Sequence, residues 1–184
     1  LGGSSPILEL TKKQADALET MLNEHQTTVQ YKCFVVMRCW HPRASDVIKA
    51  VKQYNPQEIV LMPLYPQYSA ATSGSSIKEW RDVCKKNKYD VKTSTICCYP
   101  IDQNFINAHT NEILKKIKNL QNYKLIFSAH GLPKKNIEKG DPYQWQVENS
   151  VNKIVQNINY ENLDWVLSYQ SRVGPLKWIG PSTD

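Results

Sequence analysis

The sequence lacks several features that would assign it to a common class of protein. No apolar run approaches the ~20 residues of a membrane-spanning helix. The five cysteines are odd in number and show no C-x-x-C spacing, which argues against a disulfide framework and against a zinc site. Free thiols in a reducing compartment fit this pattern best. The opening, LGGSSPI, has neither an initiator methionine nor the charged and apolar regions of a signal peptide.

Motifs for nucleotide binding and for serine hydrolases are also missing. There is no G-x-x-x-x-G-K, no G-x-G-x-x-G and no G-x-S-x-G. The net charge of +6 comes from lysines scattered along the chain, which is typical of solvated helix faces rather than of a nucleic-acid groove. A basic surface is compatible with an anionic substrate or an anionic membrane surface.

The chain nevertheless has enough apolar residues, 41%, to build a core, and their pattern alternates between strands and helices. Strands are predicted at 31–37, 58–64, 91–97, 124–128 and 164–169. Helices are predicted at 11–25, 44–54, from about 75, at 102–120 and at 142–158, with Thr11 and Asp141 as N-caps of the first and last. Strict alternation predicts an α/β fold with parallel strands.

His130 is the most prominent candidate for chemistry. It follows the apolar run Leu125-Ile126-Phe127 in KLIFSAHGLP, where a buried strand ends. Ligands of open α/β sheets bind beyond the carboxyl ends of strands, and an imidazole there can ligate a metal or accept a proton. A structural role for His130 is the alternative. His41 follows a strand end and is a weak candidate, whereas His25 at a helix end and His109 within a helix are expected to be surface residues.

Two other strand ends carry polar and aromatic clusters. The segment LYPQYSAATSGSS precedes a predicted helix, so its hydroxyls and amides indicate either an anion site or an ordinary helix cap. After the last strand, Ser171, Arg172 and Trp178 lie in a loop punctuated by glycine and proline. Trp178 either forms a wall for a flat, apolar ligand or fills the loop against the core.

Six motifs together resemble the ferrochelatase family over essentially the whole chain: GGSSPI, MRCWHP, LYPQYSAATSGSS, FSAHGLP, GDPY and SYQSRVGPLKWIGPSTD. The resemblance implies two Rossmann-like α/β halves, each with a parallel sheet flanked by helices, and a cleft between them. We assign the halves to residues 1–89 and 90–184, each incomplete, because members of the family exceed 300 residues.

The resemblance also implies a reaction: insertion of ferrous iron into protoporphyrin IX in the last step of haem synthesis. His130 matches the essential active-site histidine and is expected to bind the metal, accept a proton, or both. The positions that match the lining of the porphyrin cleft are Ser5, Arg38, Tyr65, Thr72, Ser171 and Trp178. Iron is a substrate here, and no prosthetic group is expected.

Departures from the family pattern limit these expectations. Cys39 replaces a tyrosine or histidine, and Ala70 stands where animal-type members have a cluster-ligating cysteine, so no iron–sulfur cluster is expected. Paired histidines of some members are absent at Asp102 and Gln103. The family's active-site glutamate lies beyond this sequence, so we expect the chain to be inactive alone and its full-length parent to be active.

Alternatives remain in two directions. One is a porphyrin- or haem-binding module without catalysis; the other is a chelatase for coproporphyrin or for cobalt. The Lys- and Asn-rich composition indicates an AT-rich bacterial genome. The resemblance, with no targeting segment recognised, implies a cytoplasmic location and, as a further expectation, peripheral contact with the inner membrane. Nucleic acid is not an expected partner, and the oligomeric state is open.

Overall fold

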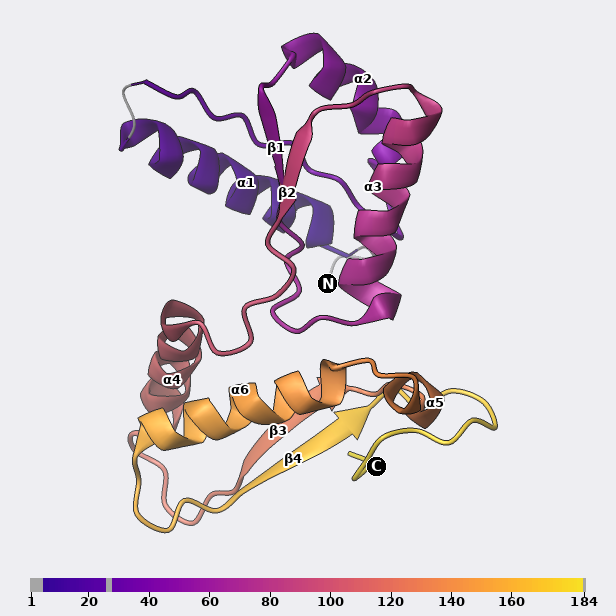
Figure 1. The fold of residues 1–184 in the computed structure, drawn as a ribbon. Coiled ribbons are helices and arrows are strands. Elements are labelled where there is room, and N and C mark those ends of the chain that lie inside the picture. The colour runs from indigo at the N-terminus through magenta and orange to yellow at the C-terminus, as the bar shows by residue number, and fades with distance from the viewer. Residues whose placement is uncertain (1–4, 26–27, 184) are drawn as a thin grey trace. The chain divides into compact units, whose positions relative to one another are not determined.

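The computed structural model describes residues 5–25 and 28–183, which form two compact units (Figure 1). The first unit comprises Leu1–Leu61 and Ser75–Thr95, and the second comprises Met62–Gly74 and Ile96–Asp184. The first residues of the GGSSPI motif and Asp184 lie outside the described residues. Each unit is an α/β assembly with its own two-stranded parallel sheet, as the alternating pattern predicts.

The first unit pairs two short strands and covers them with helices. Its elements are α1 (Ile7–Glu24), α2 (Ala44–Tyr54), β1 (Glu58–Leu61), α3 (Ser75–Lys86) and β2 (Lys92–Thr95). Strands β1 and β2 run parallel, with Glu58 opposite Lys92 and Leu61 opposite Thr95. This pairing keeps the chain as far as Thr95 with the first unit, whereas the sequence-based division falls after residue 89. That division stays a prediction about the family's two halves.

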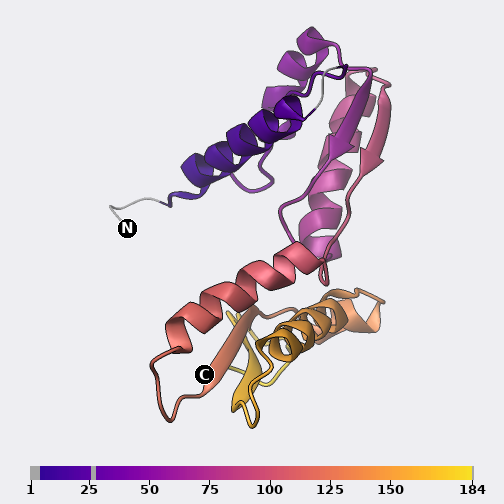
Figure 2. The same cartoon turned by 90° about the vertical axis from the view of Figure 1, so that its left-hand side faces the viewer.

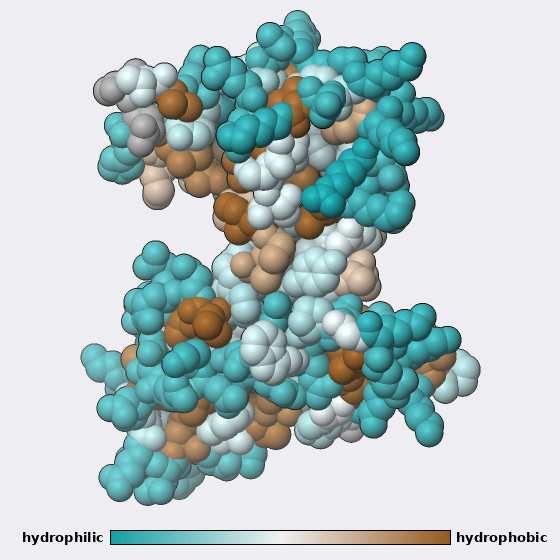
Figure 3. All heavy atoms as spheres, in the orientation of Figure 1, coloured by the Kyte–Doolittle hydropathy of each residue, from teal (hydrophilic) through white to brown (hydrophobic). Residues whose placement is uncertain are grey.

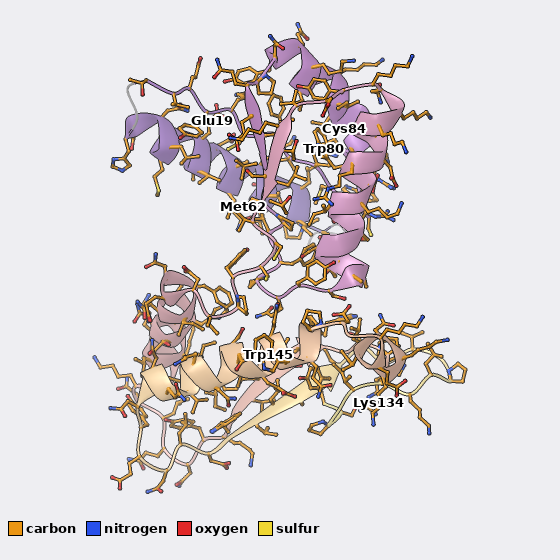
Figure 4. The ribbon with its side chains drawn as sticks, in the orientation of Figure 1. Glu19, Met62, Trp80, Cys84, Lys134 and Trp145 are labelled. Carbon is orange, nitrogen blue, oxygen red and sulfur yellow. The ribbon has the colours of Figure 1, made fainter. Side chains whose placement is uncertain are left out.

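Helix α2 shows how the sequence sets the limits of an element. At its start, the Arg43 backbone N–H donates to Asp46 Oδ2 over 2.7 Å, and at its end Asn55 adopts a left-handed φ of 56°. Its apolar face packs against Trp80 of α3, which lies on the side of α3 toward the strands (Figure 4). The buried residues of this cluster are Ala44, Val47, Ile48, Val51 and Trp80.

The predicted strand at 31–37 is wrong, because this segment belongs to no strand in the described structure. Within the described residues, β1 pairs only with β2, so no neighbouring strand satisfies this backbone. Side chains of α1 bind the backbone of this segment instead. Asn23 Nδ2 donates to the Tyr31 carbonyl, and Asn23 Oδ1 accepts from the Tyr31 N–H. Glu19 Oε2 accepts from the Cys33 N–H at 2.7 Å. That N–H and the Lys32 ammonium lower the pKa of Glu19.

The second unit contains the elements that position His130. They are the π-helix η1 (Ala70–Gly74), α4 (Gln103–Ile117), β3 (Leu125–His130), α5 (Lys134–Glu138), α6 (Tyr143–Ile158) and β4 (Trp165–Gln170). Strands β3 and β4 are parallel over six pairs, from Leu125 opposite Trp165 to His130 opposite Gln170. Helices α4 and α6 pack against each other (Figure 2).

Helix α6 is the centre of this unit's packing. One group of its apolar side chains packs with Leu132, Tyr169 and Ile179, and another packs with α4. Trp145 of α6, by contrast, is 65% exposed (Figure 4). The buried α6 residues are Gln146, Val147, Ser150, Val151, Ile154 and Ile158.

Some predicted element ends are wrong by a few residues. Helix α1 begins at Ile7 with Pro6 as its N-cap, while Thr11 lies inside the helix and donates to the Ile7 carbonyl. Pro142, not Asp141, occupies the N-cap of α6, although Asp141 Oδ1 still accepts the Tyr143 N–H. Strand β3 continues to His130, two residues beyond its predicted end, because the pairing with β4 continues that far.

The surface agrees with the scattered charge of the sequence. Hydrophilic side chains, in teal, cover much of the visible face of each unit, and hydrophobic side chains, in brown, form smaller patches between them (Figure 3). Among the described residues, no helix is both long and apolar enough to cross a membrane.

Candidate functional site at the carboxyl end of β3

His130 is the last residue of β3 and lies opposite Gln170, the last residue of β4. Both side chains are exposed at the carboxyl ends of parallel strands. The prediction that His130 lies at this edge is confirmed, and this edge is where α/β sheets bind ligands. An exposed imidazole here is available to a proton or a metal ion without rearrangement of the strand.

The backbone after His130 is held closely against the C-terminal loop. The Gly131 N–H donates to the Gln170 carbonyl at 2.7 Å, and the Ile179 N–H donates to the Leu132 carbonyl at 3.0 Å. A Cβ on Gly131 would lie 2.9 Å from the Gln170 oxygen and 3.3 Å from Trp178 Cε3. Glycine is therefore required by this close approach of backbone and indole.

We expect Gly131→Ala to lower the free energy of unfolding by about 1–3 kcal/mol, because the added methyl meets a backbone oxygen that cannot move alone. Urea unfolding measures this cost. Gly180→Ala is the matched control, since the closest atom to its Cβ would be the end of the Arg172 side chain, at 3.1 Å, and the nearest backbone atom is Ser182 N at 3.7 Å. Equal stability of the two variants would contradict the close packing at Gly131.

Trp178 packs beside this turn and forms an isolated antiparallel bridge with Pro133. The side chain is half-buried, and its Nε1 is buried without a hydrogen-bond partner among the described residues. This geometry favours the interpretation that the indole fills the loop against the core. Its role as a wall for a flat ligand stays a prediction.

Ser171 and Arg172 begin the C-terminal loop. Ser171 is exposed with a φ of 66°, a left-handed conformation that costs energy for a residue with a side chain. Arg172 Nη2 donates to the Ile179 carbonyl at 3.3 Å, which closes the loop on itself. Backbone strain of this kind is often found at functional sites, so Ser171 stays a candidate for ligand binding.

The segment containing YPQYS lies along α6. Gln67 Nε2 donates to Ser150 Oγ at 2.8 Å, and the Tyr68 N–H donates to Gln146 Oε1 at 2.7 Å. The segment then forms η1, and π-helical turns occur frequently at functional sites. Thr72 lies within this turn, while Tyr65 lies before it with 44% of its surface exposed.

The structure does not favour an anion site at the start of this helix. Helix α3 begins at Ser75, as predicted, but η1 precedes it directly, so the first amides of the helical run are those of η1. There the Ala70 N–H already donates to Asp141 Oδ2 at 2.9 Å, and the Ala71 N–H donates to Ser69 Oγ at 3.1 Å. A carboxylate of the chain itself therefore occupies the position that a bound anion would take.

Ser5 and Arg38 belong to the first unit. Ser5 Oγ accepts from the Ile7 N–H at 3.3 Å at the start of α1. Arg38 Nε lies 3.2 Å from Glu79 Oε2, and Arg43 Nη2 lies 2.7 Å from Glu79 Oε1. Arg38 is thus already paired with a carboxylate, and its assignment to a porphyrin cleft stays a prediction.

The second unit therefore brings together His130, the 171–178 loop and, through α6, the segment with Tyr65 and Thr72. Sequence reasoning gave Asp141 the role of a helix cap and used Tyr143 only as part of the GDPY motif, although both bond to the predicted site. Within residues 5–25 and 28–183, no three His, Cys, Asp or Glu side chains group as potential metal ligands.

Comparison with known proteins points to a family. The family model described as ferrochelatase matches residues 1–184. The chain is 78% identical over 184 residues to the ferrochelatase of Pelagibacter ubique, covering all of this chain and 54% of the relative. It is 49% identical to that of a Wolbachia of Drosophila simulans and 45% identical to that of Rickettsia bellii, covering 59% and 51% of those proteins.

The chain spans about half the length of the curated relatives that it matches. The family match, in contrast, extends over every residue of the sequence. The motifs at the carboxyl end of β3, at η1 and in the C-terminal loop are among the six on which the resemblance rests. The chain belongs to the ferrochelatase family.

Proposed function

We propose that the full-length protein carrying this sequence inserts ferrous iron into protoporphyrin IX to form protohaem. The observation that carries the proposal is the family match over all 184 residues, together with an exposed His130 at a ligand-binding edge. The chain covers about half of its relatives, so we propose that residues outside it complete the reaction.

The chemistry assigns a task to each predicted residue. Two pyrrole N–H protons must leave the porphyrin as the iron enters. His130 accepts one of them or passes the iron to the ring, since its neutral imidazole can do either. Binding that bends the macrocycle tilts the nitrogen lone pairs out of the ring plane, so binding energy contributes to reaching the transition state.

The ring itself needs apolar walls and polar ends. Trp178 supplies aromatic surface next to the His130 turn. Hydroxyls of Ser5, Thr72 and Ser171, the phenol of Tyr65 and the guanidinium of Arg38 supply partners for the propionates. Protoporphyrin is the proposed substrate rather than coproporphyrin, and ferrous iron rather than cobalt. We further propose that the protein acts in the bacterial cytoplasm, contacts the inner membrane peripherally, and binds no iron–sulfur cluster and no nucleic acid.

A graft tests this function in a complete protein. In it, this sequence replaces the 184 matching residues of the Pelagibacter ubique relative, with which it is 78% identical. Anaerobic incubation with protoporphyrin IX and ferrous iron is expected to give the absorbance bands of protohaem. Parallel assays with coproporphyrin and with cobalt test the substrate choice. A folded graft that binds porphyrin but forms no metalloporphyrin would contradict the proposal.

A further inference from the structure

Asp141 joins two segments of the candidate site that lie far apart in sequence. Its Oδ2 accepts from Ser69 Oγ at 2.8 Å and from the Ala70 N–H at 2.9 Å, at the first residue of η1. Ser69 is 1% exposed, so its bond to Asp141 is partly protected from water, whereas the bond from the Ala70 N–H is exposed. A charged acceptor with two donors binds more strongly than a neutral one. The carboxylate therefore fixes where η1 begins.

The second oxygen of the same carboxylate binds the start of α6. Asp141 Oδ1 accepts from the Tyr143 N–H at 3.0 Å, and the Asp141 N–H donates to the Asn136 carbonyl at 3.1 Å. Both oxygens and the backbone amide of Asp141 are thus engaged. The first turn of α6 is held in place relative to η1, because one rigid carboxylate binds both.

Tyr143 continues this connection to the candidate catalytic residue. Its hydroxyl donates to the His130 carbonyl at 3.0 Å. The side chain also packs against the apolar cluster that contains Leu132 and Tyr169. Burial, and after it the charge of Asp141, raise the pKa of the Tyr143 phenol, so the hydroxyl remains a donor throughout the neutral range.

We propose that Asp141 and Tyr143 are positioning residues that hold His130 in a fixed relation to η1. This inference rests on the proposed function, in which neither residue is assigned to binding porphyrin or iron. The chain of contacts runs from Ala70 through Asp141 and Tyr143 to the His130 carbonyl. The η1 turn, which contains Thr72, and the backbone that carries the His130 imidazole are thereby held in one arrangement, and catalysis by bound groups is sensitive to such placement.

The first experiment removes only the hydroxyl that contacts His130. In the graft, Tyr143→Phe is expected to lower kcat about tenfold with KM for protoporphyrin within twofold, since the ring still fills its place. Tyr123→Phe is the matched control, because Tyr123 packs at the α4–α6 cluster away from His130, and it is expected to leave both constants unchanged. A kcat that Tyr143→Phe does not lower would overturn the proposal.

The second experiment removes the charge at Asp141. Asp141→Asn is expected to accelerate hydrogen exchange at the Ala70 amide about tenfold in the 184-residue chain, because a neutral amide offers one acceptor oxygen to three donors. Asp102→Asn is its control: Asp102 Oδ1 caps α4 by accepting from the Phe105 N–H, a task that asparagine performs equally well.

The double variant tests whether Asp141 acts on His130 through Tyr143. If it does, adding Asp141→Asn to Tyr143→Phe changes kcat and the NMR signals of the His130 ring far less than it does in the wild type. Independent, multiplicative effects would overturn the proposed order of contacts. The ring signals and hydrogen exchange are measured without turnover. A graft that fails to metallate would therefore disprove the proposed function while these readouts still decide the positioning role.

Discussion

Replacement of His130 by alanine in the graft is expected to lower the rate of iron insertion by at least about 100-fold, because a positioned acid or base contributes that much or more. The side chain is exposed at the end of β3, so its removal leaves the β3–β4 pairing intact. KM for protoporphyrin is expected to change little, since the imidazole supplies none of the proposed ring-binding surface. Initial rates under anaerobic conditions, with ferrous iron in excess, measure both constants.

His109→Ala provides the control for loss of an imidazole. His109 lies in the middle of α4 with its ring 4.6 Å from that of Phe105, in a different element from the candidate residues. Its rate is expected to stay within twofold of the parent. An unchanged rate in His130→Ala, or an equal loss in both variants, would show that the chemistry does not depend on the β3 end.

The second large effect concerns stability. Ile154→Ala is expected to lower the free energy of unfolding by about 2–5 kcal/mol, because Ile154 is 4% exposed between α6 and α4 and leaves a cavity when truncated. Ile126→Ala on β3 is the control: its side chain is 57% exposed, and we expect a loss below about 1 kcal/mol.

Urea unfolding followed by circular dichroism compares these two variants. A smaller loss for Ile154→Ala than for Ile126→Ala would mean that α4 and α6 do not form the core of the second unit. Amide hydrogen exchange along α6 gives an independent reading, since loss of this packing should open the helix locally.

Local patterns were sufficient to predict most helices and the parallel strands. Helix α2 agrees at both ends with its predicted range, because its apolar spacing, its first-turn Asp46 and its C-terminal Asn55 all act within a few residues. The position of His130 at a strand end could also be predicted from neighbouring residues, since an apolar run followed by glycine and proline indicates where a strand ends.

What sequence reasoning missed depends on contacts between distant residues. The 31–37 segment has the composition of a strand, yet its backbone bonds to Asn23 and Glu19 rather than to a neighbouring strand. The η1 turn resembles an ordinary helix start until Asp141, 71 residues from Ala70, is seen to bind its first amide. Neither partner can be inferred from spacing, because only the folded chain brings them together.

The most direct test of the central claim is an absorbance titration of protoporphyrin IX into the 184-residue chain, followed by anaerobic addition of ferrous iron or zinc. We expect a saturable spectral change, which would show that this segment carries the porphyrin site, and metalloporphyrin bands from the graft but not from the chain alone. Saturable binding with no metallation by either protein would favour a porphyrin-binding module. A folded chain that shows no saturable change would contradict the assignment of the porphyrin site to these residues.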